Sequence, residues 1–108
     1  MDEREFRRQA DHAIDQLHRR LTAAAEEYEF ESDINAGALT IEFEDPPAKF
    51  VVSPNAPVRQ IWVSAHSRSY KLDWNPERGL FVYPDSGESL TELIGSAVGK
   101  QLGSEVHL

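Results

Sequence analysis

The chain has 108 residues, a hydrophobic fraction of 40% and a formal net charge of −8. This length and composition predict one globular domain, residues 1–108, with a core that needs neither disulfides nor a structural metal. The absence of cysteine excludes disulfides, thiolate metal sites and thiol catalysis. No apolar run reaches the ~18–20 residues of a membrane span.

The first predicted element is an amphipathic helix from about residue 3 to residue 25. Apolar side chains recur there at three- and four-residue steps, and the segment contains neither glycine nor proline. This pattern predicts that one stripe of the helix packs against the core while the remaining surface stays in solvent.

The exposed side of this helix carries a possible cation site. Asp11, Asp15 and His18 follow i, i+4, i+7 spacing, so we expect them to form one stripe opposite the core. Arg7 and Arg8 precede Asp11 by four and three residues, and another arginine follows Asp15 by four. Ordinary surface ion pairs are therefore the alternative interpretation of this stripe.

Two strands, 27–34 and 39–44, are predicted next, joined by a tight turn at 35–37. In the first strand the residues facing the core alternate with four acids. In the second strand two further acids face away from the core. This pattern predicts a hairpin with one acidic face, made by Glu27, Glu29, Glu31, Asp33, Glu42 and Glu44.

All the surplus negative charge lies in this part of the chain. Residues 1–25 hold five acids and five bases and residues 46–108 hold six of each, whereas residues 26–45 hold eight acids and no base. Such a local field attracts hard cations, for which carboxylate oxygens are suitable ligands, or a basic partner. Same-face strand positions are ~6.5–7 Å apart, which favours weak binding of several partly hydrated ions. A solvated strand that protects the sheet edge is the alternative.

The second half of the chain predicts four strands and a helix. Prolines bracket short runs at 48–53, 59–65, 69–74 and 80–83. A capping box then opens a helix at Ser89. Because Gly95, Gly99 and Gly103 lie opposite its core stripe, we expect this helix to be short or frayed.

The order helix, six strands, helix predicts an α+β fold. It is a two-layer α/β sandwich whose antiparallel six-stranded sheet carries the N- and C-terminal helices on one face. Alternation in the run 60–65 places Trp62 on the other, solvent-exposed face with Gln60 and Ser64. An outward Trp is either an anchor for a protein partner or a ring that stacks with a cation such as Lys71.

Several classes of function are disfavoured. The histidines show no metal-enzyme spacing, the serines lie in turns or caps, and no glycine loop suited to phosphate is present. Nucleic acid is disfavoured because the strongest local field is negative. A non-enzymatic protein of the bacterial cytoplasm, without contact to a membrane, is therefore expected.

The chain also resembles a known family. Five segments carry the resemblance: Glu5-Phe6-x-Arg8-x-Ala10-Asp11, Asp33-Ile34-Asn35-x-Gly37-x-Leu39-Thr40-Ile41, Gln60-Ile61-Trp62-Val63-Ser64, Lys71-Leu72-Asp73-Trp74 and Ser86-Gly87-Glu88-Ser89-Leu90-x-Glu92-Leu93. In their order and spacing they resemble the frataxin family, most closely its bacterial CyaY branch. The resemblance implies the same sandwich fold.

It also implies a function, namely weak binding of ferrous or ferric iron on an acidic ridge and regulation of iron–sulfur cluster assembly. The implied partners are a cysteine desulfurase, which meets the ridge, and a scaffold protein, which meets the Trp-bearing sheet face. The metal candidates are Asp11, Asp15, His18, Glu26, Glu27, Glu29, Glu31 and Asp33. The partner-binding candidates are Glu42, Glu44, Asn55, Gln60, Trp62 and Lys71.

Three points stay open. An iron-oxidising or iron-storing protein and an acidic adaptor that binds no metal are the alternatives. The second half of the first helix has fewer acids than bacterial frataxins usually carry there, which shifts the expected metal site toward the following strands. A monomer is expected, with iron-induced oligomerisation as a further state.

Overall fold

Helix α1 (Glu3–Ala24) opens the chain in this computed structural model, which describes residues 1–108 throughout. Asp2 caps the helix, since its side chain accepts a hydrogen bond from the Glu5 N–H at 2.8 Å. One stripe of the helix is buried, as the apolar spacing predicts. Its members are Phe6, Ala10, Ile14, Leu17 and Leu21.

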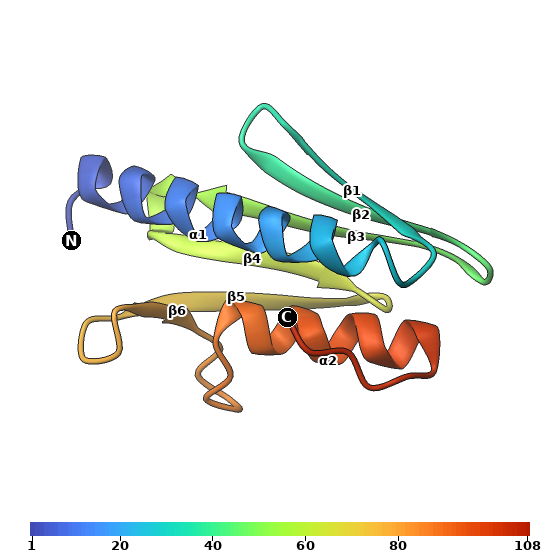
Figure 1. Cartoon of the computed structure of the whole chain (residues 1–108). Helices are drawn as coiled ribbons and strands as arrows, with labels where there is room; N and C mark the ends of the chain where they lie inside the picture. Colours follow the sequence, from blue (N-terminus) through green and yellow to red (C-terminus); the bar gives the residue numbers. More distant parts are fainter.

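Six strands form one antiparallel sheet in which each strand pairs with its neighbours in sequence. Both helices lie on one face of this sheet, and the core fills the space between the layers (Figure 1). The predicted two-layer sandwich is confirmed. The strands are β1 (Phe30–Asn35), β2 (Ala38–Glu44), β3 (Pro47–Asn55), β4 (Gln60–Ala65), β5 (Arg68–Asn75) and β6 (Leu80–Val82). A short 3₁₀ helix, η1 (Ala56–Val58), joins β3 to β4.

The start of the first strand differs from the prediction. We expected a strand from residue 27, but β1 begins at Phe30. The N–H groups of Glu27 and Tyr28 donate to the carbonyl of Ala24, at 3.0 and 3.1 Å, so helix-like turns continue past the end of α1. Glu27 and Glu29 therefore lie in the connection between α1 and β1, and the prediction of four acids on one strand face was wrong.

Two tight turns fix the register of the sheet. Ala36 and Gly37 join β1 to β2, and His66 and Ser67 join β4 to β5. All four residues have positive φ, between 52° and 82°. Such two-residue turns match the twist of antiparallel strands. Because the second turn closes at Ala65, every pair between β4 and β5 is determined from it.

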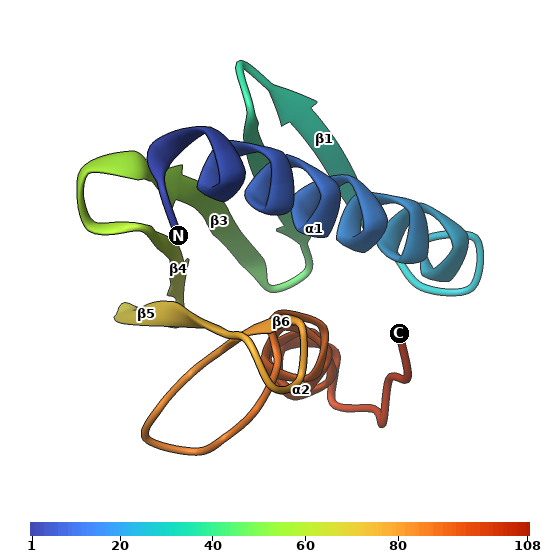
Figure 2. The same cartoon turned by 90° about the vertical axis from the view of Figure 1, so that its left-hand side faces the viewer.

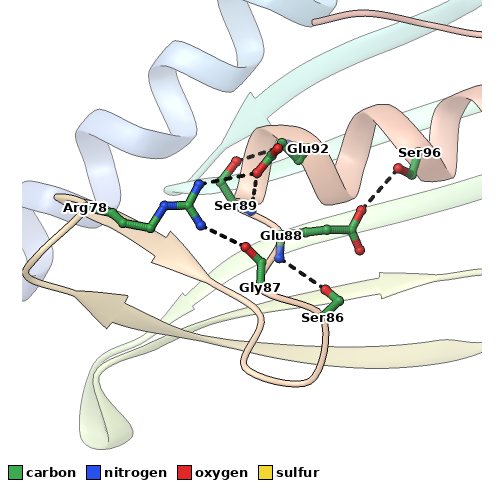
Figure 3. A network of polar contacts seen from close by, with 7 residues as sticks. All are labelled: Arg78, Ser86, Gly87, Glu88, Ser89, Glu92 and Ser96. Atoms are coloured by element: carbon green, nitrogen blue, oxygen red, sulfur yellow. Dashed lines mark hydrogen bonds and ion pairs between the residues drawn. The ribbon is translucent and has the colours of Figure 1, made fainter.

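Helix α2 (Leu90–Leu102) begins at a dense polar network (Figure 3). Ser89 and Glu92 form the predicted capping box, in which the Ser89 N–H donates to Glu92 Oε1 at 2.9 Å and the Glu92 N–H donates to Ser89 Oγ at 3.3 Å. Arg78 donates to the Gly87 carbonyl at 2.8 Å and lies 3.5 Å from Glu92 Oε1. Thus the β5–β6 turn and the start of α2 hold each other in place.

The expectation of a short or frayed C-terminal helix was wrong. α2 runs for 13 residues and ends at Gly103 with a left-handed φ of 69°. Residues 104–108 fold back along its glycine face, where a Cβ on Gly99 would lie 2.7 Å from the Ser104 carbonyl oxygen. Figure 1 shows this tail running back along α2, and Figure 2, which views α2 nearly end-on, shows it at the side of the helix. Val106 reaches the core and is 8% exposed, so the tail replaces solvent over the glycines.

Neither helix combines the length and apolar character needed to cross a bilayer.

Candidate functional site

Eight carboxylates gather around the β1–β2 side of the molecule, and we call this set the acidic edge. Every member has an exposed side chain, and none takes part in an ion pair. The charge of this region is therefore not neutralised by neighbouring groups. The acidic edge consists of Glu26, Glu27, Glu29, Glu31, Asp33, Glu42, Glu44 and Asp45.

Part of the acidic edge stands on paired strands. Glu31 of β1 lies directly opposite Glu42 of β2, and Asp33 lies opposite Thr40 on the same outward face. Like charges directly opposite each other repel and destabilise a strand pair. A shallow hollow lined by Glu31, Asp33 and Glu42 lies here, between the end of α1 and the hairpin. A cation or a basic side chain placed here would relieve the repulsion.

The remaining members lie in or next to the connections. Glu26, Glu27 and Glu29 belong to the segment that joins α1 to β1, Glu44 is the last residue of β2, and Asp45 begins the turn to β3. Lys49 of β3 stands opposite Glu42. Lys49 is the basic residue that the strand pairing brings directly opposite a member of the acidic edge, and it forms no ion pair with it.

The acidic edge does not form a closed metal site. No three carboxylate or imidazole side chains of the chain come together as ligands for one ion. Exposed carboxylates fit hard, oxygen-preferring cations that retain much of their water. The donor set thus suits hydrated hard cations that are loosely held rather than a resident structural ion.

The predicted stripe on α1 is only partly present. Asp11 and Asp15 are exposed, but His18 is half-buried and its Nδ1 lies 2.8 Å from Ser32 Oγ on β1. Asp15 pairs with Arg19 at 3.1 Å. His18 therefore ties α1 to the edge strand, and the expectation of a fully exposed stripe was wrong for this residue.

The ion pairs of α1 also differ from those expected at Asp11. Arg7 pairs with Glu3 at 3.7 Å, and Arg8 forms a short contact with Glu5. Both arginines thus turn toward the start of the helix, where acids are favoured. Asp11 takes part in no ion pair. It lies on the same side of α1 as His18, which faces β1.

The second candidate surface is the solvent-exposed face of the sheet around Trp62, which is 37% exposed as predicted. Its indole N–H donates to Gln60 Oε1 at 3.0 Å, and the Gln60 amide donates to Asp73 Oδ1, also at 3.0 Å. Lys71 Nζ lies 4.9 Å from the centre of the indole ring. Trp62 therefore stacks with Lys71, which was one of the two predicted arrangements. This contact and the hydrogen bond to Gln60 hold the indole ring in one orientation.

The last predicted partner residue lies beside this group. Asn55 at the end of β3 pairs in register with Gln60, and Ser53 pairs with Trp62. Asn55 is half-buried. The cross-strand register thus brings Asn55, Gln60, Trp62 and Lys71 together, as predicted, and separates them from Glu42 and Glu44.

Two residues of these surfaces were missed by the sequence analysis. Asp73 accepts the hydrogen bond that orients Gln60, and Ser32 bonds His18. The tight turn at His66 could have identified Asp73, because counting back from that turn pairs it with Gln60. No local signal in the sequence identifies Ser32, since 14 residues separate it from His18.

Comparisons with known proteins agree in one family. The description "Frataxin-like domain" fits residues 1–104 of the chain. The iron-sulfur cluster assembly protein CyaY of Azotobacter vinelandii is 30% identical over 96 residues, or 87% of this chain and 86% of that protein. Its namesake from Pseudomonas aeruginosa is also 30% identical over 96 residues, or 87% and 88%. A solved frataxin from Psychromonas ingrahamii has a TM-score of 0.78 and 27% identity, covering 99% of this chain and 97% of that one.

Proposed function

Because the chain belongs to the bacterial CyaY branch of the frataxin family, we propose that it acts in iron–sulfur cluster assembly. Its relatives carry the name of assembly proteins rather than of enzymes. We propose in more detail that it is an iron-binding regulator. It would dock the acidic edge onto a cysteine desulfurase and turn the Trp62 face toward the scaffold protein.

The single observation that carries this proposal is the exposed, unpaired state of all eight carboxylates of the acidic edge. Surface acids that serve the fold are found in ion pairs or caps, as Glu5 and Glu92 are here. The acidic edge makes no such contacts. Its charge remains available for a basic protein surface, where complementary charge gives rapid and salt-sensitive association.

Iron is the cargo in this proposal. Glu31, Asp33 and Glu42 offer the densest group of carboxylates, and the segment 26–29 and Asp11 supply others nearby. Since no three of them converge on one ion, we expect several weak sites with hydrated ions rather than one tight site. Isothermal titration with ferrous and with ferric iron tests this directly.

The docking test reverses the charge of Glu27, Glu29, Glu31 and Asp33 to lysine. Each substitution adds two positive charges, so the net charge changes from −8 to 0. We expect the desulfurase affinity at low salt to fall at least ~100-fold, since like-charge contacts at an interface cost several kcal/mol. Unchanged affinity would rule out electrostatic docking through the acidic edge.

A matched pair separates local charge from total charge. Glu31→Lys/Asp33→Lys and Glu77→Lys/Asp85→Lys change the net charge equally, but only the first pair lies on the acidic edge, since Glu77 and Asp85 lie in the connections on either side of β6. We expect the first variant to bind the desulfurase ~10-fold more weakly at 50 mM salt and the second to bind like the parent. Equal losses would show that only the total charge matters.

An adaptor that never holds metal is the second candidate, and the absence of converging ligands favours it. Iron titration that shows no heat and no saturation, together with intact desulfurase binding, would support this candidate over the iron-binding regulator. An iron-oxidising protein would instead consume oxygen when it is mixed with ferrous iron.

A further inference from the structure

The sheet has an incomplete edge on the side opposite the acidic edge. β5 contains eight residues, but β6 contains only three and pairs with Asp73, Trp74 and Asn75 alone. The first half of β5 therefore has no strand on its outer side. Figure 1 shows the segment after β6 turning away below the sheet.

Proline explains why β6 ends so early. If the register of Val82 with Asp73 continued, Pro84 would lie opposite Lys71. Proline has no N–H to donate, so it cannot fill the hydrogen-bonded position opposite Lys71. Pro84 instead begins the turn that leads to α2.

The free backbone groups can be assigned to two residues. The turn at His66 and Ser67 makes Ala65 and Arg68 a hydrogen-bonded pair. Hydrogen-bonded positions alternate along antiparallel strands. The backbone N–H and C=O groups of Arg68 and Tyr70 therefore bond to β4, while those of Ser69 and Lys71 point away from β4, toward the free edge. Neither Ser69 nor Lys71 takes part in the backbone bonds made outside helices and strands. Two donors and two acceptors are thus free.

An apolar groove adjoins this free edge on the core side of the sheet. It has a volume of about 320 Å³ and lies between the start of β5 and α2. The rings of Tyr70 and Tyr83, which meet edge to face at 5.2 Å, stand on one side. The floor consists of Val63, Ala65, Leu93 and Ala97.

The rim of the groove is basic, although the chain as a whole is acidic. Arg68 and Lys100 line it and form no ion pair, while the one acid, Glu88, accepts a hydrogen bond from Ser96 at 3.2 Å. Arg68 lies over the Tyr70 ring at 5.6 Å. On the solvent side of the same edge, Lys71 adds another positive charge. A segment that binds here should therefore be acidic.

We propose that this part of β5 binds an extended acidic peptide of another protein, which adds to the sheet as an antiparallel strand. Side chains alternate between the two faces of a strand. The peptide that fits has an apolar residue opposite Tyr70, entering the groove, and acidic residues opposite Ser69 and Lys71. This inference is independent of the proposed role in cluster assembly.

The first test titrates the ¹⁵N-labelled chain with a capped heptapeptide that alternates glutamate and valine. We expect saturable shifts of the Ser69 and Lys71 amide signals and at least ~10-fold slower hydrogen exchange at both amides, because each N–H gains a partner. A heptapeptide that alternates lysine and valine should cause no such change. Absence of shifts at these two amides with 1 mM of the acidic peptide would overturn the proposal.

N-methylated peptides test the strand pairing itself. Directly opposite residues share a face, so the glutamates carry the N–H groups that bond Ser69 and Lys71. Methylation of the glutamate nitrogens should abolish binding, whereas methylation of the valine nitrogens, with the same mass and charge, should leave it within ~2-fold. Equal affinity of the two peptides would show attraction by charge alone and would reject strand addition.

Protein variants give independent controls. Ser69→Pro removes one outward donor and leaves the β4 pairing in place, so it should weaken binding ~5-fold or more. Lys71→Glu puts a like charge beside the peptide glutamate on the solvent face and should weaken binding, but Lys49→Glu, distant in the sheet, should not. Concentration-dependent shifts of the same amides without peptide would assign the edge to a second copy of the chain and reject a foreign peptide as its occupant.

Discussion

The acidic edge and the Trp62 face lie on one sheet but are built in opposite ways. On the acidic edge, eight carboxylates stand in solvent without ion pairs. On the Trp62 face, a chain of contacts runs from Asp73 through Gln60 to the indole and Lys71. Free charge acts over distances near the Debye length of ~8 Å at physiological salt, whereas an oriented ring acts only in contact. The first surface therefore suits attraction of a partner, and the second suits its final fit.

Among single substitutions that would test this contrast, the largest effect on partner binding is expected at Trp62. We expect Trp62→Ala to weaken scaffold binding about 30-fold, since truncation of an interface hot spot costs ~2 kcal/mol or more. The melting temperature should fall by less than ~5 °C, because the ring is exposed and fills no core position. Calorimetric binding and thermal unfolding of the same samples check both. A large fall in melting temperature would make the ring structural. Trp74→Phe, at a half-buried ring that packs against the core, serves as the control.

A smaller effect is expected on stability at the acidic edge. Glu31→Gln removes the repulsion with Glu42 across the β1–β2 pair. We expect the free energy of unfolding to rise by ~0.5 kcal/mol and the melting temperature by ~2–4 °C. Thermal unfolding at low salt checks this.

The control for this variant is Glu77→Gln, which removes an exposed charge outside the acidic edge. If Glu31→Gln lowers the melting temperature, or raises it no more than this control does, the acids are not in electrostatic conflict. A rise would show that the acidic edge is retained at a cost to folding.

The smallest effect, a pH-dependent change in melting temperature, is expected at Glu92, whose carboxylate stabilises the start of α2. Hydrogen bonds with the Ser89 backbone and hydroxyl hold the pKa of Glu92 below its usual 4.5, and the positive charge of the nearby Arg78 lowers this pKa further. A lowered folded pKa contributes stability above pH 4.5 that is lost as the pH falls through the folded value. Glu92→Gln keeps a hydrogen-bonding side chain but no charge. The difference in melting temperature between the parent and this variant should thus be largest near pH 7 and should shrink as the pH falls below 4.5.

A difference that does not change between pH 7 and pH 3 would contradict this assignment. In that case the Glu92 carboxylate would act in the capping box through its shape rather than through its charge.

Most of the fold could be predicted because hydrophobic periodicity and turn residues are local signals. The stripe of α1, the capping box at Ser89 and the outward side of Trp62 all follow from spacing within a few residues. The start of β1 was misplaced because alternation at residues 27–29 matches a strand. The structure instead continues the helical turns there, with Tyr28 bonded back to Ala24.

The long-range contacts could not be predicted. The His18 bond to Ser32 depends on how α1 crosses the edge strand. The position of the tail over Gly95 and Gly99 depends on space that only the folded helix reveals. For the candidate site, residue types and exposure were predictable. The strand spacing also predicted that the acids would not converge on one ion, and the structure agrees. Which acids lie on paired strands and which lie in the connections became clear only in three dimensions.

The tail over α2 has a practical consequence for anyone who handles this protein. Leu108 lies near Gly95 and Val106 is docked in the core, so a tag or fluorophore fused after Leu108 would pull on a packed segment. Met1 is 47% exposed and precedes the helix cap, so a label there disturbs no contact of the core. Assays of the two surfaces should therefore use labels at the amino end.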